Sequence, residues 1–117
     1  MNKTFEEVWD DILDVAKSRT TISTLSRKKE NKIVDFSNSH ITVESMETLS
    51  PRKLLKGAFE HIWDRLTQSK TLTLKELQDE PKVWKQGAII FAFFDRLDYV
   101  DAVQYPLLTL RLKERGV

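Results

Sequence analysis

The sequence predicts an α+β fold with an N-terminal helix, a three-stranded antiparallel meander, a three-helix unit and a C-terminal strand pair. Apolar residues recur at helical spacing in 5–17 and again in 51–97, which predicts helices at both places. Three short β-branched segments lie within 20–44, and polarity alternates again after residue 98. With 117 residues the chain is long enough to bury one sizeable core, so we expect a single domain over 1–117.

Residues 5–17 are predicted to form the first helix. Its apolar positions follow a helical period: Phe5, Val8, Trp9, Ile12, Val15 and Ala16. Thr4 is a candidate N-cap and Glu7 follows three residues later, which is the pattern of a capping box. The outer face of this helix is acidic. It is either a solvated face or a patch that binds a partner.

Three strands are predicted in 20–25, 32–36 and 40–44, because these segments are short, β-branched and bounded by turn formers. The connections 26–31 and 37–39 have lengths that hairpin loops accept. We therefore expect an antiparallel meander, within 1–46, that buries one face. The residues expected on that face are Ile22, Ile33, Phe36, Ile41 and Val43.

The second half is predicted to begin with a helix over 51–68. Ser50 can act as its N-cap, and Pro51 follows at the first helical position, where a missing N–H costs nothing. The apolar stripe of this helix is made of Leu55, Ala58, Phe59, Ile62, Trp63 and Leu66.

Two more helices and a strand pair complete the chain. Thr73 and Glu76 repeat the capping-box pattern and predict a short helix over 74–79. The segment 83–97 is the most apolar of the chain and is predicted to be a helix with almost every side chain packed. Alternating polarity then predicts a strand pair within 99–112, although the last segment also fits a helical period.

Composition excludes several classes of protein. The absence of cysteine rules out disulfides and thiolate chemistry, and no apolar run approaches the roughly 20 residues of a membrane-spanning helix. The first 14 residues carry five carboxylates where an export signal needs a basic start and an apolar stretch. We therefore expect a cytoplasmic protein without membrane association.

Residues for catalytic chemistry are sparse. His40 and His61 have no partner at metal-ligand spacing, and three glycines cannot build a phosphate-binding loop. A serine–histidine–acid triad could still assemble from positions that are distant in the chain. Within 79–82 a Glu-x-Lys unit resembles that of nucleases, but Pro81 places it in a turn. We therefore expect a protein that is not an enzyme and holds no metal or cofactor.

Positive charge is concentrated in one stretch of the chain. Residues 17–36 hold six basic and two acidic side chains, whereas the net charge of the whole chain is only +1. The predicted hairpin loop within this stretch carries three adjacent cations that could reach a phosphate backbone, although a solvated turn is the competing interpretation. The predicted nucleic-acid-binding residues are Arg27, Lys28, Lys29, Lys82, Lys85 and Arg96.

Two patterns carry a resemblance to known proteins. The first is the order of elements predicted in 50–112, and the second is a set of motifs: Thr24-Leu25-Ser26-Arg27, 31–36, 41–45 and the helix that contains Trp63. The order of elements resembles a winged helix, a fold most often used on DNA. The motifs are similar to those of accessory modules attached to bacterial restriction endonucleases and helicases of phage-defence and mobile-element systems. This resemblance implies a non-catalytic module that binds double-stranded DNA.

The third helix departs from a DNA-binding winged helix. Such a helix must offer several polar side chains to base edges, and 83–97 offers only Lys85, Gln86 and Arg96. We therefore expect phosphate contacts with little sequence reading, or a buried third helix with contact made by the loop 27–29.

A function of a different class also fits the sequence. The protein could be a protein–protein adaptor or a small homo-oligomer in which the acidic face of the first helix, or the region of Trp84, docks a partner or a second copy. The nucleic-acid hypothesis has a structural consequence that the adaptor lacks. It requires the loop 27–29 and the strip 82–96 to share one continuous surface.

Overall fold

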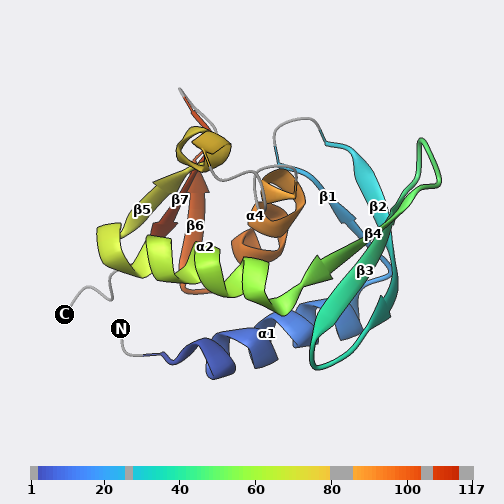
Figure 1. Ribbon diagram of the computed structural model, residues 1–117, viewed down its shortest axis with the longest axis horizontal. Helices are drawn as coiled ribbons and strands as arrows, with labels where there is room; N and C mark the ends of the chain where they lie inside the picture. The colour runs from blue at the N-terminus through green and yellow to red at the C-terminus, as the bar shows by residue number, and fades with distance from the viewer. Residues whose placement is uncertain (1–2, 26–27, 80–85, 104–106, 114–117) are drawn as a thin grey trace.

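The computed structural model describes residues 3–25, 28–79, 86–103 and 107–113, and it confirms the α+β class (Figure 1). Within these residues the helices are α1 (Phe5–Ser18), α2 (Lys56–Ser69), the 3₁₀-helix η1 (Leu74–Asp79) and α4 (Gly87–Asp95). One antiparallel sheet has the order β1-β2-β3-β4, with strands β1 (Thr21–Ser23), β2 (Glu30–Phe36), β3 (His40–Ser45) and β4 (Pro51–Leu55). The other has the order β5-β7-β6, with strands β5 (Thr71–Thr73), β6 (Val100–Val103) and β7 (Thr109–Leu112).

Helix α1 forms where its local signals predict it. The Glu7 N–H donates to Thr4 Oγ1 at 3.3 Å, and the Thr4 N–H donates to Glu7 Oε1 at 3.0 Å, so the predicted capping box is present. The bond from the Thr4 backbone also lowers the pKa of the Glu7 carboxyl. On the opposite face Trp9 is buried, and its indole N–H donates to the Asn38 carbonyl at 3.1 Å. This bond ties α1 to the turn between β2 and β3.

The three predicted strands of the meander are confirmed, with one error in the expected buried face. Ile41 and Val43 are buried, as is Ile22 on β1. A bulge at Val34 interrupts the β2–β3 register between Ile33 and Asp35. Phe36 is paired with Ile41 and therefore lies on the same face of the sheet. However, it is at the end of β2, and its side chain is 37% exposed.

The predicted helix start at Ser50 and Pro51 is wrong. The segment Pro51–Leu55 is the edge strand β4, and α2 begins only at Lys56. Leu54 pairs with Ile41 and is completely buried, so the burial of a side chain against a distant strand outweighs the local cap pattern. Proline is tolerated because an edge strand leaves alternate N–H groups without a partner in the sheet.

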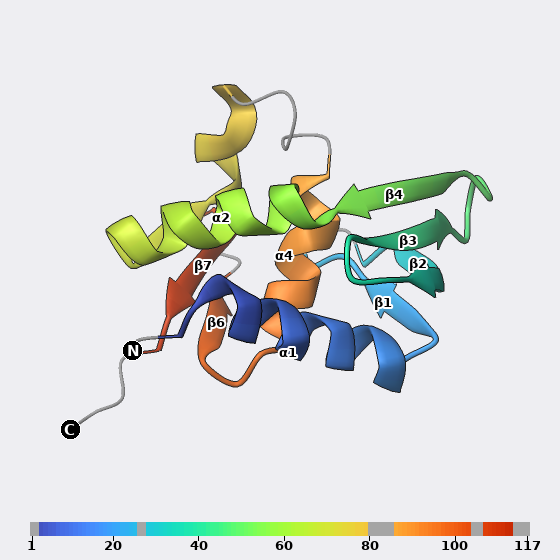
Figure 2. The same cartoon turned by 60° about the horizontal axis from the view of Figure 1, so that its bottom comes forward.

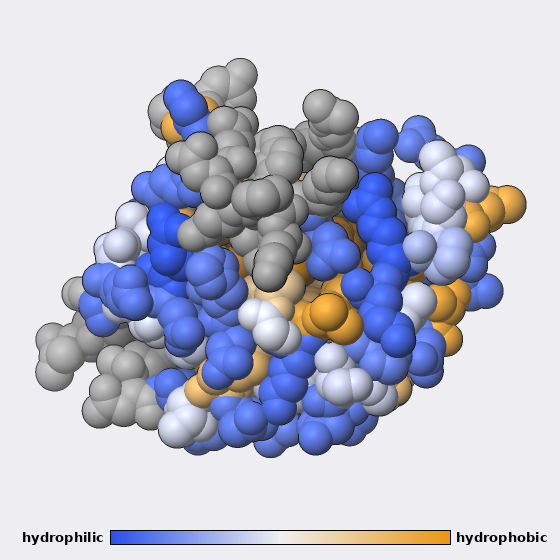
Figure 3. Space-filling view, in the orientation of Figure 1, coloured by the Kyte–Doolittle hydropathy of each residue, from blue (hydrophilic) through white to orange (hydrophobic). Residues whose placement is uncertain are grey.

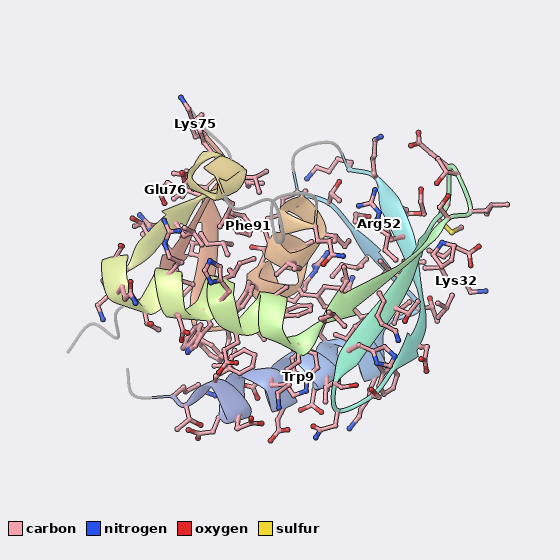
Figure 4. All side chains as sticks on the ribbon, in the orientation of Figure 1. Trp9, Lys32, Arg52, Lys75, Glu76 and Phe91 are labelled. Carbon is pink, nitrogen blue, oxygen red and sulfur yellow. The ribbon has the colours of Figure 1, made fainter. Side chains whose placement is uncertain are left out.

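Helix α4 lies at the centre of the molecule, between the two sheets (Figures 1 and 2). Seven of its nine residues are buried, and Phe91 points into the space between the elements (Figure 4). The ring of Phe59 on α2 lies 5.2 Å from Trp9 and 5.8 Å from Phe93, measured between centroids. Residues 83–85 of the predicted helix lie outside the described residues, but the described part confirms that this apolar helix is packed on almost every side.

The three-stranded sheet confirms the predicted C-terminal strand pair and excludes the helical alternative for its last segment. The predicted short helix is the 3₁₀-helix η1, and its capping box is present because Thr73 and Glu76 exchange two bonds of 3.1 Å. The strand arrangement of the whole molecule differs from that of a simple winged helix, because the four-stranded sheet precedes the three-stranded sheet in the chain. Within the described residues, no helix combines the length and apolar character needed to cross a bilayer.

Candidate nucleic-acid interface

Three of the six predicted nucleic-acid-binding residues lie within the described part of the chain. Arg27, Lys82 and Lys85 lie outside it, as do Trp84 and the Glu-x-Lys unit. Lys28 and Lys29 lie together in the connection between β1 and β2, and both are exposed. The ammonium of Lys29 lies 3.3 Å from Glu47 Oε2, so a carboxylate already compensates this cation.

Arg96 lies in a different part of the molecule. It caps the C-terminal end of α4, where its N–H donates to the Phe93 carbonyl at 3.2 Å. It lines an open groove of about 520 Å³ between α1 and the α4–β6 connection, together with Asp14 and Asp98. Figures 1 and 2 both place this connection away from the β1–β2 connection. The structure therefore brings Lys28 and Lys29 together and places Arg96 in a separate groove among carboxylates.

One end of this groove is closed by a network of three side chains. Asp11 Oδ2 accepts a hydrogen bond of 2.8 Å from Lys3 Nζ and one of 2.7 Å from the Tyr99 hydroxyl. Burial acts to raise the pKa of Asp11, but these two bonds outweigh it and the net pKa is lowered. Burial, followed by the bond to Asp11, raises the pKa of Tyr99. Tyr99 is therefore a neutral donor that joins β6 to α1.

A second groove, of about 540 Å³, is basic. Its described lining consists of Lys70, Thr71, Arg111, Leu112 and Lys113, and no carboxylate is among these described residues. We call it the basic groove. Its three cations are exposed, whereas Leu112 is buried and forms the floor. Arg111 has a partner outside the groove lining, since its Nη2 lies 2.8 Å from Asp101 Oδ2.

The pairing of β5 with β7 creates the basic groove. Thr71 is opposite Arg111, and the Leu112 N–H donates to the Lys70 carbonyl at 3.0 Å. Because Leu110 and Leu112 face the core, Arg111 and Lys113 alternate to the outer face of the sheet. Two cations from the C-terminal strand thus meet one that follows α2.

Sequence reasoning missed these three cations. The alternation in 110–113 predicts that Arg111 and Lys113 share an exposed face, and this was the only signal in the sequence. Lys70 lies one residue before β5, but no local sequence signal indicates that β5 pairs with β7 rather than with β6.

His40 lies in a chain of hydrogen bonds that has the composition of a catalytic triad. Its Nε2 is 3.0 Å from Asp35 Oδ2, and its Nδ1 is 3.0 Å from Ser37 Oγ. The Ser37 hydroxyl also accepts the Ser39 N–H at 3.1 Å, and the Ser37 N–H donates to the His40 carbonyl at 2.9 Å. These bonds close the turn between β2 and β3. No group of three or more potential metal ligands comes together within the described residues.

No protein-family model, no curated protein and no solved structure matches this chain at a significant level.

Proposed function

We propose that the protein is a non-catalytic nucleic-acid-binding module that contacts the phosphates of double-stranded DNA through the basic groove. The observation that carries this proposal is the composition of the described groove lining, in which Lys70, Arg111 and Lys113 converge without a carboxylate among the described residues. Arginine, lysine and threonine side chains are the common donors to phosphate oxygens. The groove offers all three types.

The charges of the groove support phosphate binding more than base recognition. Lys70 and Lys113 are exposed, and neither forms an ion pair within the described residues. A lysine ammonium binds phosphate as a point charge. Arg111 uses one arm of its guanidinium for Asp101, so it is less suited to the two-pronged contact that identifies guanine. Affinity then comes from charge, with little dependence on sequence.

The burial of α4 also supports phosphate binding with little dependence on the DNA sequence. A helix that reads the major groove must expose several polar side chains along one face. Seven of the nine residues of α4 are buried between the two sheets, so its described part has no such face to offer. Of the two outcomes expected from the sequence, a buried third helix fits this arrangement. Contacts must then come from loops and strands.

The resemblance to a winged helix is a further argument for the proposal. The order α2–β5–η1–α4–β6–β7, with a three-stranded sheet, supports a winged-helix-like unit to which α1 and the four-stranded sheet are added. On this basis we propose a cytoplasmic accessory module of the kind attached to bacterial restriction endonucleases and helicases. Lys28, with Lys29 beside it, is proposed as a second phosphate contact, although Lys29 pairs with Glu47, and Arg96 is less suited because carboxylates line its groove.

Titration of a labelled duplex at low salt tests the proposal. The variant Lys70→Ala/Lys113→Ala removes two cations from the groove, and we expect binding to weaken by about tenfold or more. The control Lys17→Ala/Lys75→Ala removes the same charge from exposed positions elsewhere, and it should bind like the wild type. Equal weakening in both variants would show that only total charge matters. No binding by the wild type would refute the function.

A protein–protein adaptor is the second candidate, and one observation favours it. The groove between α1 and the α4–β6 connection combines Val15 and Leu97 with two exposed carboxylates, Asp14 and Asp98. Asp11 also lines this groove, and its three carboxylates outnumber its two cations, Lys3 and Arg96, which favours a basic protein segment. Self-association detected by light scattering, together with the absence of duplex binding, would favour this candidate.

A further inference from the structure

The hairpin formed by β3 and β4 projects from the end of the molecule, at the opposite end of the long axis from β5 and β7 (Figures 1 and 2). Its tip, residues 46–49, carries two large apolar side chains that are exposed. Met46 is 51% exposed and Leu49 is 66% exposed, the largest exposure among the hydrophobic residues of the described chain. Figure 3 shows hydrophobic residues at the outer edge where this hairpin lies.

The tip is held in one conformation by its own hydrogen bonds. The Leu49 N–H donates to the Ser45 carbonyl at 2.8 Å, and Ser45 Oγ accepts the N–H groups of Glu47 at 3.3 Å and Thr48 at 3.4 Å. The Met46 N–H donates to the Glu30 carbonyl at 3.1 Å, which fixes the tip beside the start of β2. The two apolar side chains are therefore presented by a pre-organised loop.

The conformation and the exposure of Leu49 are both unfavourable. Its φ of 57° lies in the left-handed region, where glycine or asparagine fits and a branched side chain is strained. Its side chain also gains nothing from burial. A residue that is costly both in backbone conformation and in hydration points to a role outside folding.

Cations surround the tip. The exposed cations on the neighbouring strands and connection are Lys28, Lys29, Lys32, Arg52 and Lys53, against the carboxylates Glu30, Asp35, Glu44 and Glu47, of which Glu47 pairs with Lys29. Figure 4 shows Lys32 and Arg52 at this end of the molecule. The surroundings of the apolar tip thus hold one more cation than carboxylates, which favours an anionic partner.

We infer that the β3–β4 tip is a wedge that inserts Met46 and Leu49 between base steps of duplex DNA and kinks it. This inference rests on the proposed function and deepens it. Minor-groove proteins combine apolar wedges with basic side chains, and they offset the cost of unstacking with contacts that the bent duplex makes elsewhere. The longest extent of the molecule is 43 Å, which is about 13 base pairs of duplex at 3.4 Å each. A duplex that contacts both the wedge and the basic groove therefore needs at least about this length.

Bending of a duplex labelled at both ends tests the wedge, with resonance energy transfer as the readout and binding measured in the same titration. We expect the wild type to shorten the end-to-end distance, and to bind a duplex with a central mismatch about tenfold more tightly because a mismatched step is easier to unstack. Met46→Ala/Leu49→Ala should still bind but lose most of the bend and the preference for the mismatch. The control Val103→Ala/Leu107→Ala removes two exposed apolar side chains, one at the end of β6 and one shortly before β7, and should behave as the wild type.

The outcomes separate the wedge from the function on which it rests. Binding without bending by the wild type, or unchanged bending by the tip variant, overturns the wedge and leaves the basic groove standing. No binding to any duplex removes both. Recruitment to vesicles with anionic lipids that depends on Met46 and Leu49, with no effect of these residues on bending, overturns the wedge in favour of a membrane contact. Thermal unfolding of the tip variant should match the wild type, because both side chains are exposed.

Discussion

The Tyr99 hydroxyl donates a hydrogen bond of 2.7 Å to Asp11 Oδ2 and so joins the start of β6 to the middle of α1. The two residues are 88 positions apart in the chain. Lys3 completes the network, with its ammonium 2.8 Å from the same oxygen and 4.5 Å from the centroid of the Tyr99 ring. Three side chains from the two ends of the chain therefore meet at one carboxylate.

Removing this hydroxyl should destabilise the protein. Tyr99→Phe keeps the ring in the core but leaves Asp11 without one of its two donors, and hydrogen bonds to charged groups contribute about 1.5–3 kcal/mol. The Asp11 side chain is 34% exposed, so water replaces part of the loss and we expect about 1 kcal/mol. Urea unfolding at pH 7 measures the difference. An unchanged midpoint would show that the bond contributes nothing.

The same variant should reduce the sensitivity of the protein to acid. The pKa of Asp11 in the folded protein lies below its ordinary value of 3.8, so its stabilisation is present above that pH and is lost as the pH falls through the lowered pKa. Tyr99→Phe removes one cause of the lowering. We therefore expect the gap in unfolding free energy between wild type and variant to narrow below about pH 4.

Rising alkaline pH should reduce the stability of the wild type more steeply than that of Tyr99→Phe. The pKa of Tyr99 is raised above its ordinary value of 10.0, first by burial and then by the bond to Asp11. A raised pKa gives stabilisation that is complete below pH 10 and is lost as the pH rises towards the folded pKa. Unfolding free energies measured from about pH 9 to 11 should fall in the wild type, and less in Tyr99→Phe. Parallel curves for the two proteins would contradict this.

The two described glycines in helices should respond in opposite directions. A Cβ at Gly57 would meet nothing within 4 Å, so Gly57→Ala should stabilise α2 by about 0.5–1 kcal/mol. A Cβ at Gly87 would lie 2.7 Å from Leu74 Cδ1 and 3.3 Å from Leu77 Cδ1. Gly87→Val should therefore destabilise the packing of α4 on η1 by about 1–3 kcal/mol. Thermal unfolding distinguishes the two.

Leu49→Asn should stabilise the protein while it weakens the proposed wedge. Asparagine tolerates the left-handed conformation that strains leucine, and we expect a gain of about 0.5 kcal/mol. Thermal unfolding measures the gain, and the bending assay measures the loss. Improved stability with reduced bending is the pattern of a residue kept for function at a cost in stability. A loss of stability would mean that the side chain has packing contacts.

The salt dependence of duplex binding should count the phosphate contacts. Each neutralised phosphate changes the slope of log affinity against log salt by about −0.9, so the basic groove alone should give a slope of about −3. Lys70→Ala/Lys113→Ala should reduce its magnitude by about 2. A slope that does not differ from the wild type would place the contacts elsewhere.

Local signals predicted most of the secondary structure. Thr4 with Glu7, and Thr73 with Glu76, mark helix starts that the structure confirms. The strand at Pro51 escaped prediction because Ser-Pro is a strong local cap, and the competing signal, Leu54 against Ile41, exists only once the sheet has formed. Of the expected cationic surface, the described residues separate Arg96 from Lys28 and Lys29. The sequence does not indicate on which side of the end of α4 a side chain lies, and Arg96 lies beside α1.

The sequence by itself determined the α+β class, the first helix, the meander, the strand pair and the burial of α4, because periodicity and capping act over a few residues. Only the tertiary structure decided where charge gathers. Lys70 meets Arg111 and Lys113 through the pairing of β5 with β7, about 40 residues apart in the chain. The contact depends on which strands become neighbours, and that choice is made by the burial of Leu72, Leu110 and Leu112 in a shared core.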